Sequence, residues 1–150
     1  MEKLEFVDYS LIFLEKSWDW LNDKEIKELT MTPDFTKEQQ EQFFNSLPER
    51  TNYFIRGIAY DSIPIGACGM KNITEQDGEY WSYIGEKAFW GQGIGKEIVK
   101  YIINAAKEKS LENIYIKVGQ SNDRSINLHM KFGFLVEKIY NNQVLLRLKL

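Results

Sequence analysis

The sequence has only one cysteine, one histidine and three prolines among its 150 residues. Because a disulfide needs two cysteines, Cys68 excludes a bridge within the chain, which agrees with a reducing compartment. Cys68 also lies among apolar strand residues, so we expect it in the core. The single histidine, His129, is the only side chain that ordinarily titrates near neutral pH, and its role is the question that the sequence raises.

The chain also lacks long apolar runs and blocks of one charge. No stretch approaches the roughly 20 apolar residues that a membrane-spanning helix needs, and the opening MEKLEFVDYS lacks the basic-then-apolar pattern of a signal peptide. The 19 Lys and Arg residues and the 22 Asp and Glu residues are scattered, so no basic block offers a footprint for nucleic acid. We therefore expect a cytoplasmic protein with no nucleic-acid partner, no membrane partner and no bound metal.

No internal repeat, low-complexity segment or Pro/Gly/Ser-rich linker divides the chain, so we expect one domain over residues 1–150. The expected strands are 4–7, 53–60, 63–73, 79–85, 114–118, 135–140 and 144–150. The expected helices are 10–21, 24–29, 36–47, 94–109 and 122–132, and the first should bury Leu11, Leu14, Trp18 and Leu21 on one face. This order predicts a mixed α/β (α+β) fold with a central, mostly antiparallel sheet flanked by helices.

The segment WGQGIGKE places Gly91, Gly93 and Gly95 between an expected strand and an expected helix. Glycine lets a ligand approach the backbone closely, and the first amides of a helix have no partners within the helix. Such amides, at the positive end of the helix dipole, suit a phosphate or pyrophosphate group. The spacing fits neither a Walker A loop nor the Gly-x-Gly-x-x-Gly dinucleotide fingerprint. A glycine-rich turn that binds nothing is the alternative interpretation.

From about Trp81 to Phe134 the chain resembles the GNAT superfamily of acyl-CoA N-acyltransferases. The family signature, Gln/Arg-x-x-Gly-x-Gly/Ala, is matched at Gly93 and Gly95 by the window WGQGIG, which departs from it at Trp90. The later stretch IYIKVGQSNDRSINLHMKFGF resembles the family's strand, asparagine and helix ending in Gly-Phe. The WGxGIG form and the opening WLNDKEIKELT are similar to branches that acetylate amino sugars or ribosomal-protein N-termini.

The resemblance implies that acetyl-CoA is the co-substrate and that it lies between two splayed strands, 79–85 and 114–118. Its pyrophosphate would bind the amides of the glycine loop, which are those of Gln92, Gly93, Ile94, Gly95 and Lys96. Its pantetheine arm would run beside the backbone of Tyr83, Ile84 and Gly85. Asn122 would contact the same arm, with Asn127 as a second contact.

Acetyl transfer to an amine requires a neutral amine, a polarised thioester carbonyl and a stabilised leaving thiolate. A backbone amide of Ile84 or Gly85 would polarise the carbonyl. Glu79 shares a strand face with Trp81 and Tyr83, and it would take a proton from the amine directly or through water. An exposed carboxylate without a catalytic role is the alternative for Glu79. Other candidate bases are Glu75, Asp77 and Glu86.

His129 stands where many GNAT relatives carry a tyrosine, in a segment of the form Leu-Tyr-x-x-x-Gly-Phe whose tyrosine protonates the departing thiolate. The resemblance therefore implies that His129 is the general acid here, since imidazolium also donates a proton. The alternative is a surface or cavity histidine that replaced a lost tyrosine.

For the acceptor, the resemblance favours a small-molecule amine on a nucleotide-linked amino sugar. A protein N-terminus of the ribosomal-protein type is the second choice and a polyamine the third. The departures at Trp90 and His129 also leave open a non-catalytic acyl-CoA sensor on the same fold. We expect a monomer or a homodimer.

Overall fold

The computed structural model describes residues 3–150, which form a seven-stranded sheet in the order β1-β2-β3-β4-β5-β7-β6. The strands are β1 Leu4–Val7, β2 Phe54–Tyr60, β3 Ile63–Lys71, β4 Asp77–Ile84, β5 Asn113–Gly119, β6 Leu135–Tyr140 and β7 Gln143–Lys149. All neighbouring strands are antiparallel except β4 and β5, which are parallel. The prediction of a mixed, mostly antiparallel sheet is confirmed.

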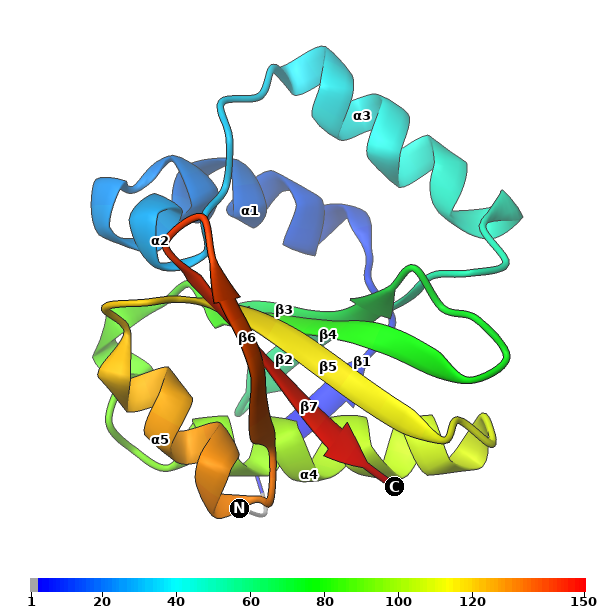
Figure 1. Cartoon of the computed structure of the whole chain (residues 1–150). Helices are drawn as coiled ribbons and strands as arrows, with labels where there is room; N and C mark the ends of the chain where they lie inside the picture. Colours follow the sequence, from blue (N-terminus) through cyan, green and yellow to red (C-terminus); the bar gives the residue numbers. More distant parts are fainter. Residues whose placement is uncertain (1–2) are drawn as a thin grey trace.

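Helices cover both faces of this sheet (Figure 1). They are α1 Leu11–Asn22, α2 Lys24–Leu29, α3 Lys37–Ser46, α4 Ile94–Glu108 and α5 Asp123–Lys131, with short 3-10 turns at Leu47–Glu49 and Lys87–Phe89. The first three helices lie over one face, and α4 and α5 lie over the other. The crossover from β4 to β5 passes through α4, and residues 85–93 connect the end of β4 to the start of α4.

The main core lies between the sheet and α4. Ile94, Ile98 and Ile102 recur along one side of α4 and pack with Ile114 of β5 and Leu146 of β7, all within 2% exposure. Each such side chain contributes about 1.5–3 kcal/mol by leaving water. This packing fixes α4 rigidly against the sheet, and with it the position of the helix N-terminus.

The buried face of α1 differs from the predicted one. Its buried residues are Phe13, Leu14, Ser17 and Trp20. Leu11, expected in this face, is 55% exposed. The reason lies in the tertiary structure, because two rings of α1 approach two glycines too closely for any side chain there. A Cβ added at Gly57 would lie 2.5 Å from the Phe13 ring, and one at Gly85 would lie 2.2 Å from the Trp20 indole. Gly57 of β2 and Gly85, the residue after β4, therefore leave room for the two aromatic rings and set the rotation of α1.

Cys68 is fully buried, as predicted, and burial raises the pKa of its thiol to about 12. It therefore stays protonated and unreactive at neutral pH. Between residues 3 and 150, no helix combines the length and the apolar character needed to cross a membrane. Across the same residues, no cluster of three or more His, Cys, Asp and Glu side chains is arranged for a metal ion.

Candidate active site

β4 and β5 pair only over their first residues. The parallel register joins Asp77 to Asn113 and ends where Glu79 meets Tyr115. Beyond that point β4 continues to Ile84 and β5 to Gly119 without pairing to each other. The two strands therefore leave a gap between them, which we call the β4–β5 gap, with unpaired backbone on both sides.

The backbone amide of Ile84 faces this gap. The Gly85 amide donates to the Ile65 carbonyl of β3 at 2.6 Å, so it is already used. Because successive residues of a strand turn their N–H groups to opposite sides, Ile84 and Ser82 point away from β3, while Tyr83 points toward it. Ser82 and Ile84, rather than Tyr83 and Gly85, therefore offer open backbone to a ligand. Ser82 is not among the residues that the sequence predicts for this site.

The start of α4 is shaped for close approach. Gly93 is its N-cap with φ +79°, a left-handed conformation that glycine adopts without strain, and no side chain caps the helix. A Cβ on Gly91 would meet nothing within 4 Å, so space is open beside the loop. Lys96 is exposed in the first turn, whereas the Gln92 side chain donates to the Ala88 carbonyl at 2.9 Å.

Trp90, the departure from the family signature, has a structural role. Its indole N–H donates to the Ile84 carbonyl at 2.9 Å and thereby ties the glycine loop to the end of β4. The loop is also tied to the helices on the opposite face, because the Trp20 indole donates to Glu86 at 3.0 Å. Trp90 therefore stabilises the loop through the Ile84 carbonyl and leaves the Ile84 amide available.

The two asparagines expected to contact pantetheine lie in different positions. Asn122 is the N-cap of α5, where its side-chain oxygen accepts from the Ser125 amide at 3.3 Å. Its amide nitrogen has no partner among the hydrogen bonds of residues 3–150. Asn127 is exposed and lies about 200° around α5 from His129, so it does not face the same side of the helix.

His129 is enclosed, with 2% of its surface exposed, between the rings of Tyr80 and Phe134 at 5.5 and 5.2 Å. Its Nδ1 donates to the Ser125 carbonyl at 2.7 Å, which places the lone pair of the neutral ring on Nε2. Nε2 is buried and has no partner within residues 3–150. Burial lowers the pKa of the imidazole, and the bond to Ser125 opposes this. His129 is therefore not a surface histidine.

The lowered pKa predicts a pH dependence of folding. Because the folded state disfavours the proton, the stability contributed by neutral His129 is fully present above about pH 6.5 and is lost as the pH falls through the lowered folded-state pKa. The free energy of unfolding in urea should fall more steeply below pH 6.5 for the wild type than for His129→Phe. Parallel pH profiles for the two proteins would contradict a buried neutral imidazole.

Glu79 is buried, with 6% exposure, at the closed end of the β4–β5 gap. Asn72 donates to Oε1 at 3.3 Å, and the ammonium groups of Lys117 and Lys71 lie 3.7 Å from its two oxygens. The alternative of an exposed carboxylate is therefore wrong. The two lysines balance the negative charge that a base carries, but they also compete for its lone pairs.

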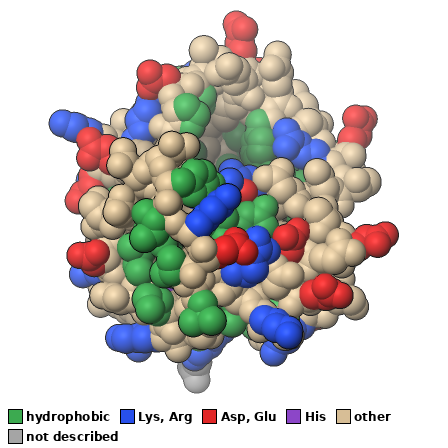
Figure 2. All heavy atoms as spheres, viewed as in Figure 1, with side chains coloured by type: hydrophobic (Ala, Val, Ile, Leu, Met, Phe, Trp, Pro, Cys, Tyr) green, Lys and Arg blue, Asp and Glu red, His purple; other side chains and the backbone are tan. Residues whose placement is uncertain are grey.

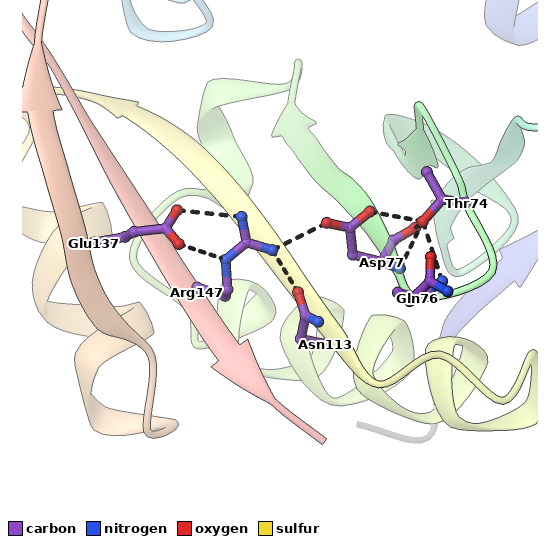
Figure 3. A network of polar contacts seen from close by, with 6 residues as sticks. All are labelled: Thr74, Gln76, Asp77, Asn113, Glu137 and Arg147. Atoms are coloured by element: carbon purple, nitrogen blue, oxygen red, sulfur yellow. Dashed lines mark hydrogen bonds and ion pairs between the residues drawn. The ribbon is translucent and has the colours of Figure 1, made fainter.

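The other candidate acids are engaged elsewhere. Asp77 accepts from Arg147 at 3.1 Å, and Arg147 also forms a two-pronged contact with Glu137 and a bond to Asn113 (Figure 3). This network joins β4, β5, β6 and β7 across the closed end of the gap, so its role is to hold the strands together there. Glu86 is bonded to Trp20, and Glu75 is exposed in the turn before β4.

An aromatic hollow lies between α1, α3 and the sheet (Figure 2). Phe43, Tyr53, Trp81 and Tyr83 form a row with ring centroids 5.7, 6.4 and 6.3 Å apart. The guanidinium of Arg50 lies 5.4 and 5.2 Å from the first two rings. No local pattern in the sequence indicates Phe43, Arg50 and Tyr53 as site residues, because their segments are distant from β4 along the chain.

The Trp81 indole N–H is buried in this hollow and has no hydrogen-bond partner in the described chain. Burial raises the pKa of the Tyr53 phenol, and the nearby indole N–H of Trp81 opposes this rise. The two groups do not meet the geometry of a hydrogen bond. A buried donor without a partner costs about 1–3 kcal/mol. The hollow therefore encloses a polar donor beside the Tyr53 phenol.

A polar cavity of about 600 Å³ lies at the far end of β5. Its walls come from α2 and the following turn, the end of β5 and the β6–β7 turn, through Glu28, Met31, Gly119, Gln120, Ser121, Asn141, Asn142 and Gln143. The Gln120 amide donates to the Asn142 carbonyl at 2.8 Å and holds the β6–β7 turn against β5. Amide side chains dominate this surface, which suits a hydroxyl-rich or peptide-like group.

Solved structures with this fold include several acetyltransferases. A domain from Methanocaldococcus jannaschii superposes with TM-score 0.84 at 20% identity and covers 99% of each chain. Campylobacter jejuni N-acetyltransferase PseH with acetyl coenzyme A gives 0.73 at 19% identity, over 97% of this chain and 98% of PseH. Vibrio cholerae spermidine N-acetyltransferase with CoA and spermine gives 0.84 at 16% identity, over 98% and 94%.

No curated protein matches the chain in sequence. The family model described as acetyltransferase (GNAT) family matches residues 15–134, which include the glycine loop, the β4–β5 gap and the segment around His129. Together with the fold and the splayed strands, this match shows that the chain belongs to the acetyltransferase (GNAT) family.

Proposed function

We propose that this protein is an acetyl-CoA-dependent N-acetyltransferase that moves the acetyl group directly to a primary amine. The observation that carries the proposal is the β4–β5 gap, which ends at the uncapped start of α4 and exposes the backbone amide of Ile84. An extended thioester with a pyrophosphate matches both parts of this site, because the strand edge offers backbone pairing and the helix start offers free amides. Members of the family use acetyl-CoA.

The glycine loop would hold the pyrophosphate through the amides that follow Gly93, with Lys96 adding a positive charge. The Ser82 backbone would pair with the pantetheine arm along the open edge of β4, which leaves the Ile84 amide for the thioester. Asn122, with a free amide nitrogen at the start of α5, would donate to the same arm. The bound co-substrate supplies the activated acetyl group.

The chain's own groups would then manage charge and protons. The Ile84 amide would donate to the thioester oxygen as negative charge develops on it. Glu79 would accept the proton that the attacking amine loses, through water where direct contact is too long. His129 would first take a proton from solvent on Nε2, and the imidazolium would then deliver that proton to the leaving sulfur. The negative charge of the sulfur would raise the imidazole pKa against the effect of burial.

For the acceptor, we favour an amino sugar linked to a nucleotide. The aromatic hollow offers rings on which a base or sugar stacks, and Arg50 at its rim offers a partner for a phosphate. The positive charge of Arg50 disfavours a polycation such as a polyamine. PseH, named as an N-acetyltransferase, shares the fold, and the spermidine enzyme, which shares it too, keeps a polyamine acceptor among the alternatives.

We expect turnover with a nucleotide-linked amino sugar to exceed turnover with ribosomal N-terminal peptides or polyamines. Arg50→Met should raise KM for the nucleotide-linked sugar about 10-fold, as expected for a lost charge-assisted hydrogen bond, and leave KM for the free amino sugar unchanged. Steady-state kinetics on the three amine classes measure this. A kcat/KM that is equal or higher on peptides would contradict the sugar assignment without affecting the transferase assignment.

A non-catalytic acyl-CoA sensor is the competing function. Release of free thiol from acetyl-CoA, followed with a panel of amines, separates the two functions. An enzyme releases thiol only when an amine is present, because direct transfer needs the acceptor. Tight binding of acetyl-CoA with no amine-dependent thiol release from any of the three classes would favour the sensor.

A further inference from the structure

The edge of the sheet at β6 is unusually apolar for an exposed surface. Among residues 3–150, eight large hydrophobic side chains are exposed, and four of them lie on β6 or on the adjacent end of α5: Met130, Leu135, Val136 and Ile139. Figure 2 shows hydrophobic side chains gathered over this part of the molecule. Single exposed apolar residues are ordinary, but a contiguous group marks an interaction surface.

These side chains divide between the two faces of the sheet. Val136 and Ile139 lie opposite Leu146 and Val144 of β7, which belong to the core beneath α4 and α5. They therefore share the α5 face with Met130. Lys138 lies opposite Leu145 and is on the other face, where Glu137 reaches Arg147.

β6 is also the terminal strand of the sheet, so its outer backbone edge has no partner strand within residues 3–150. Its sequence is complementary to itself when two copies run antiparallel about an axis between Glu137 and Lys138. In that register Glu137 lies opposite Lys138, Val136 opposite Ile139, and Leu135 opposite Tyr140. Each acid meets a base, and each apolar residue meets another apolar or aromatic residue, on matching faces.

We propose that a second copy of this chain covers β6 about a two-fold axis, with the two β6 strands antiparallel and side by side. A closed two-fold interface uses the same patch on both subunits, as this self-complementary strand requires. The four Val136 and Ile139 side chains would form one apolar stripe between the two α5 helices, closed at its ends by Met130. The charged pairs on the other face would fix the register.

Two features of β6 bear on this interface. A bulge between Val136 and Lys138 shifts the register with β7, and Lys138 places a charge on the edge; both devices commonly keep edge strands from pairing with unrelated strands. In the antiparallel register the charge of Lys138 meets Glu137 of the second copy, so a second copy is tolerated where other strands are not.

Light scattering coupled to size-exclusion chromatography, at micromolar concentration, tests the interface. The wild type should be a dimer, and Ile139→Lys should weaken it by about 100-fold or more, because each subunit then places a charge in the apolar stripe. Ile63→Lys, an equivalent change at a side chain that is 53% exposed at the start of β3, should leave the dimer intact. Circular dichroism should show that both variants remain folded.

A monomeric wild type, or a dimer that Ile139→Lys leaves unchanged, would overturn the proposal, as would open-ended oligomers. The register has its own test in the double variant Val136→Cys and Ile139→Cys. Oxidation should link two chains covalently in the double variant and not in either single variant, because each new thiol lies opposite its partner only when both are present. Failure of the dimeric double variant to cross-link would overturn the antiparallel register.

Discussion

Replacing Gly93 with glutamate is expected to abolish the binding of acetyl-CoA, measured by titration calorimetry and by the loss of ligand-induced thermal stabilisation. The wild type should gain about 2.7 kcal/mol of stability at a ligand concentration 100 times Kd. The glutamate side chain would bring both bulk and a negative charge to the helix start, where a pyrophosphate is expected. The left-handed φ of +79° would also be strained by any side chain.

A control variant separates loss of the ligand from backbone strain. Gly133 also has a left-handed φ, +97°, and lies after α5, away from the glycine loop. Gly133→Ala should therefore lower the folding stability by about 1–2 kcal/mol, as backbone strain at Gly93 would, and leave acetyl-CoA binding unchanged. Binding by a folded Gly93→Glu variant would contradict the assigned pyrophosphate site, and no binding by the wild type at millimolar ligand would contradict the proposed function.

Replacing His129 with phenylalanine is expected to lower kcat by about 10²–10⁴-fold, the usual effect of removing a positioned acid, with little change in KM for acetyl-CoA. The ring would keep its packing against Tyr80 and Phe134 but lose Nε2. His129→Tyr should recover part of the activity, because tyrosine donates a proton from the same helix. Ser125→Ala keeps the backbone carbonyl that holds Nδ1 and should stay within a few-fold of the wild type.

The pH dependence distinguishes an acid from a packing residue. In the neutral ring Nδ1 carries the hydrogen, so Nε2 donates only after protonation. The ratio of the wild-type kcat to the His129→Phe kcat should therefore be largest at acid pH and fall as the pH rises. Since deprotonation of the amine affects both proteins equally, it cancels in this ratio. A small ratio that does not change with pH would show that His129 only packs.

Local patterns in the sequence were sufficient for the secondary structure and the fold class. Thr36 and Gln39 form a capping box at α3, and the Ile spacing of α4 marks its buried side. The order of strands and helices then restricts the sheet to a few arrangements, and the mostly antiparallel one is observed. These features depend on neighbours within a few residues, which is why the sequence alone predicts them.

The rotation of α1 and the environment of Glu79 depended on the tertiary structure. The helical spacing of α1 is compatible with more than one buried face. Gly57 on β2 and Gly85 just after β4, both distant in the chain, select the face that carries Phe13 and Trp20. Glu79 is buried because Lys71 and Lys117 arrive from the two neighbouring strands. Nothing near these residues in the sequence indicates such partners.

The candidate site shows the same division. By itself, the sequence identified the glycine loop, the segment around His129 and the resemblance that unites them. Only the tertiary structure decided that Ile84 and Ser82 face the β4–β5 gap, that Nε2 of His129 is buried without a partner, and that Arg50 lies beside the aromatic hollow. The physical reason is that backbone direction, burial and cross-chain contacts arise from strand pairing and packing, which join segments far apart along the chain.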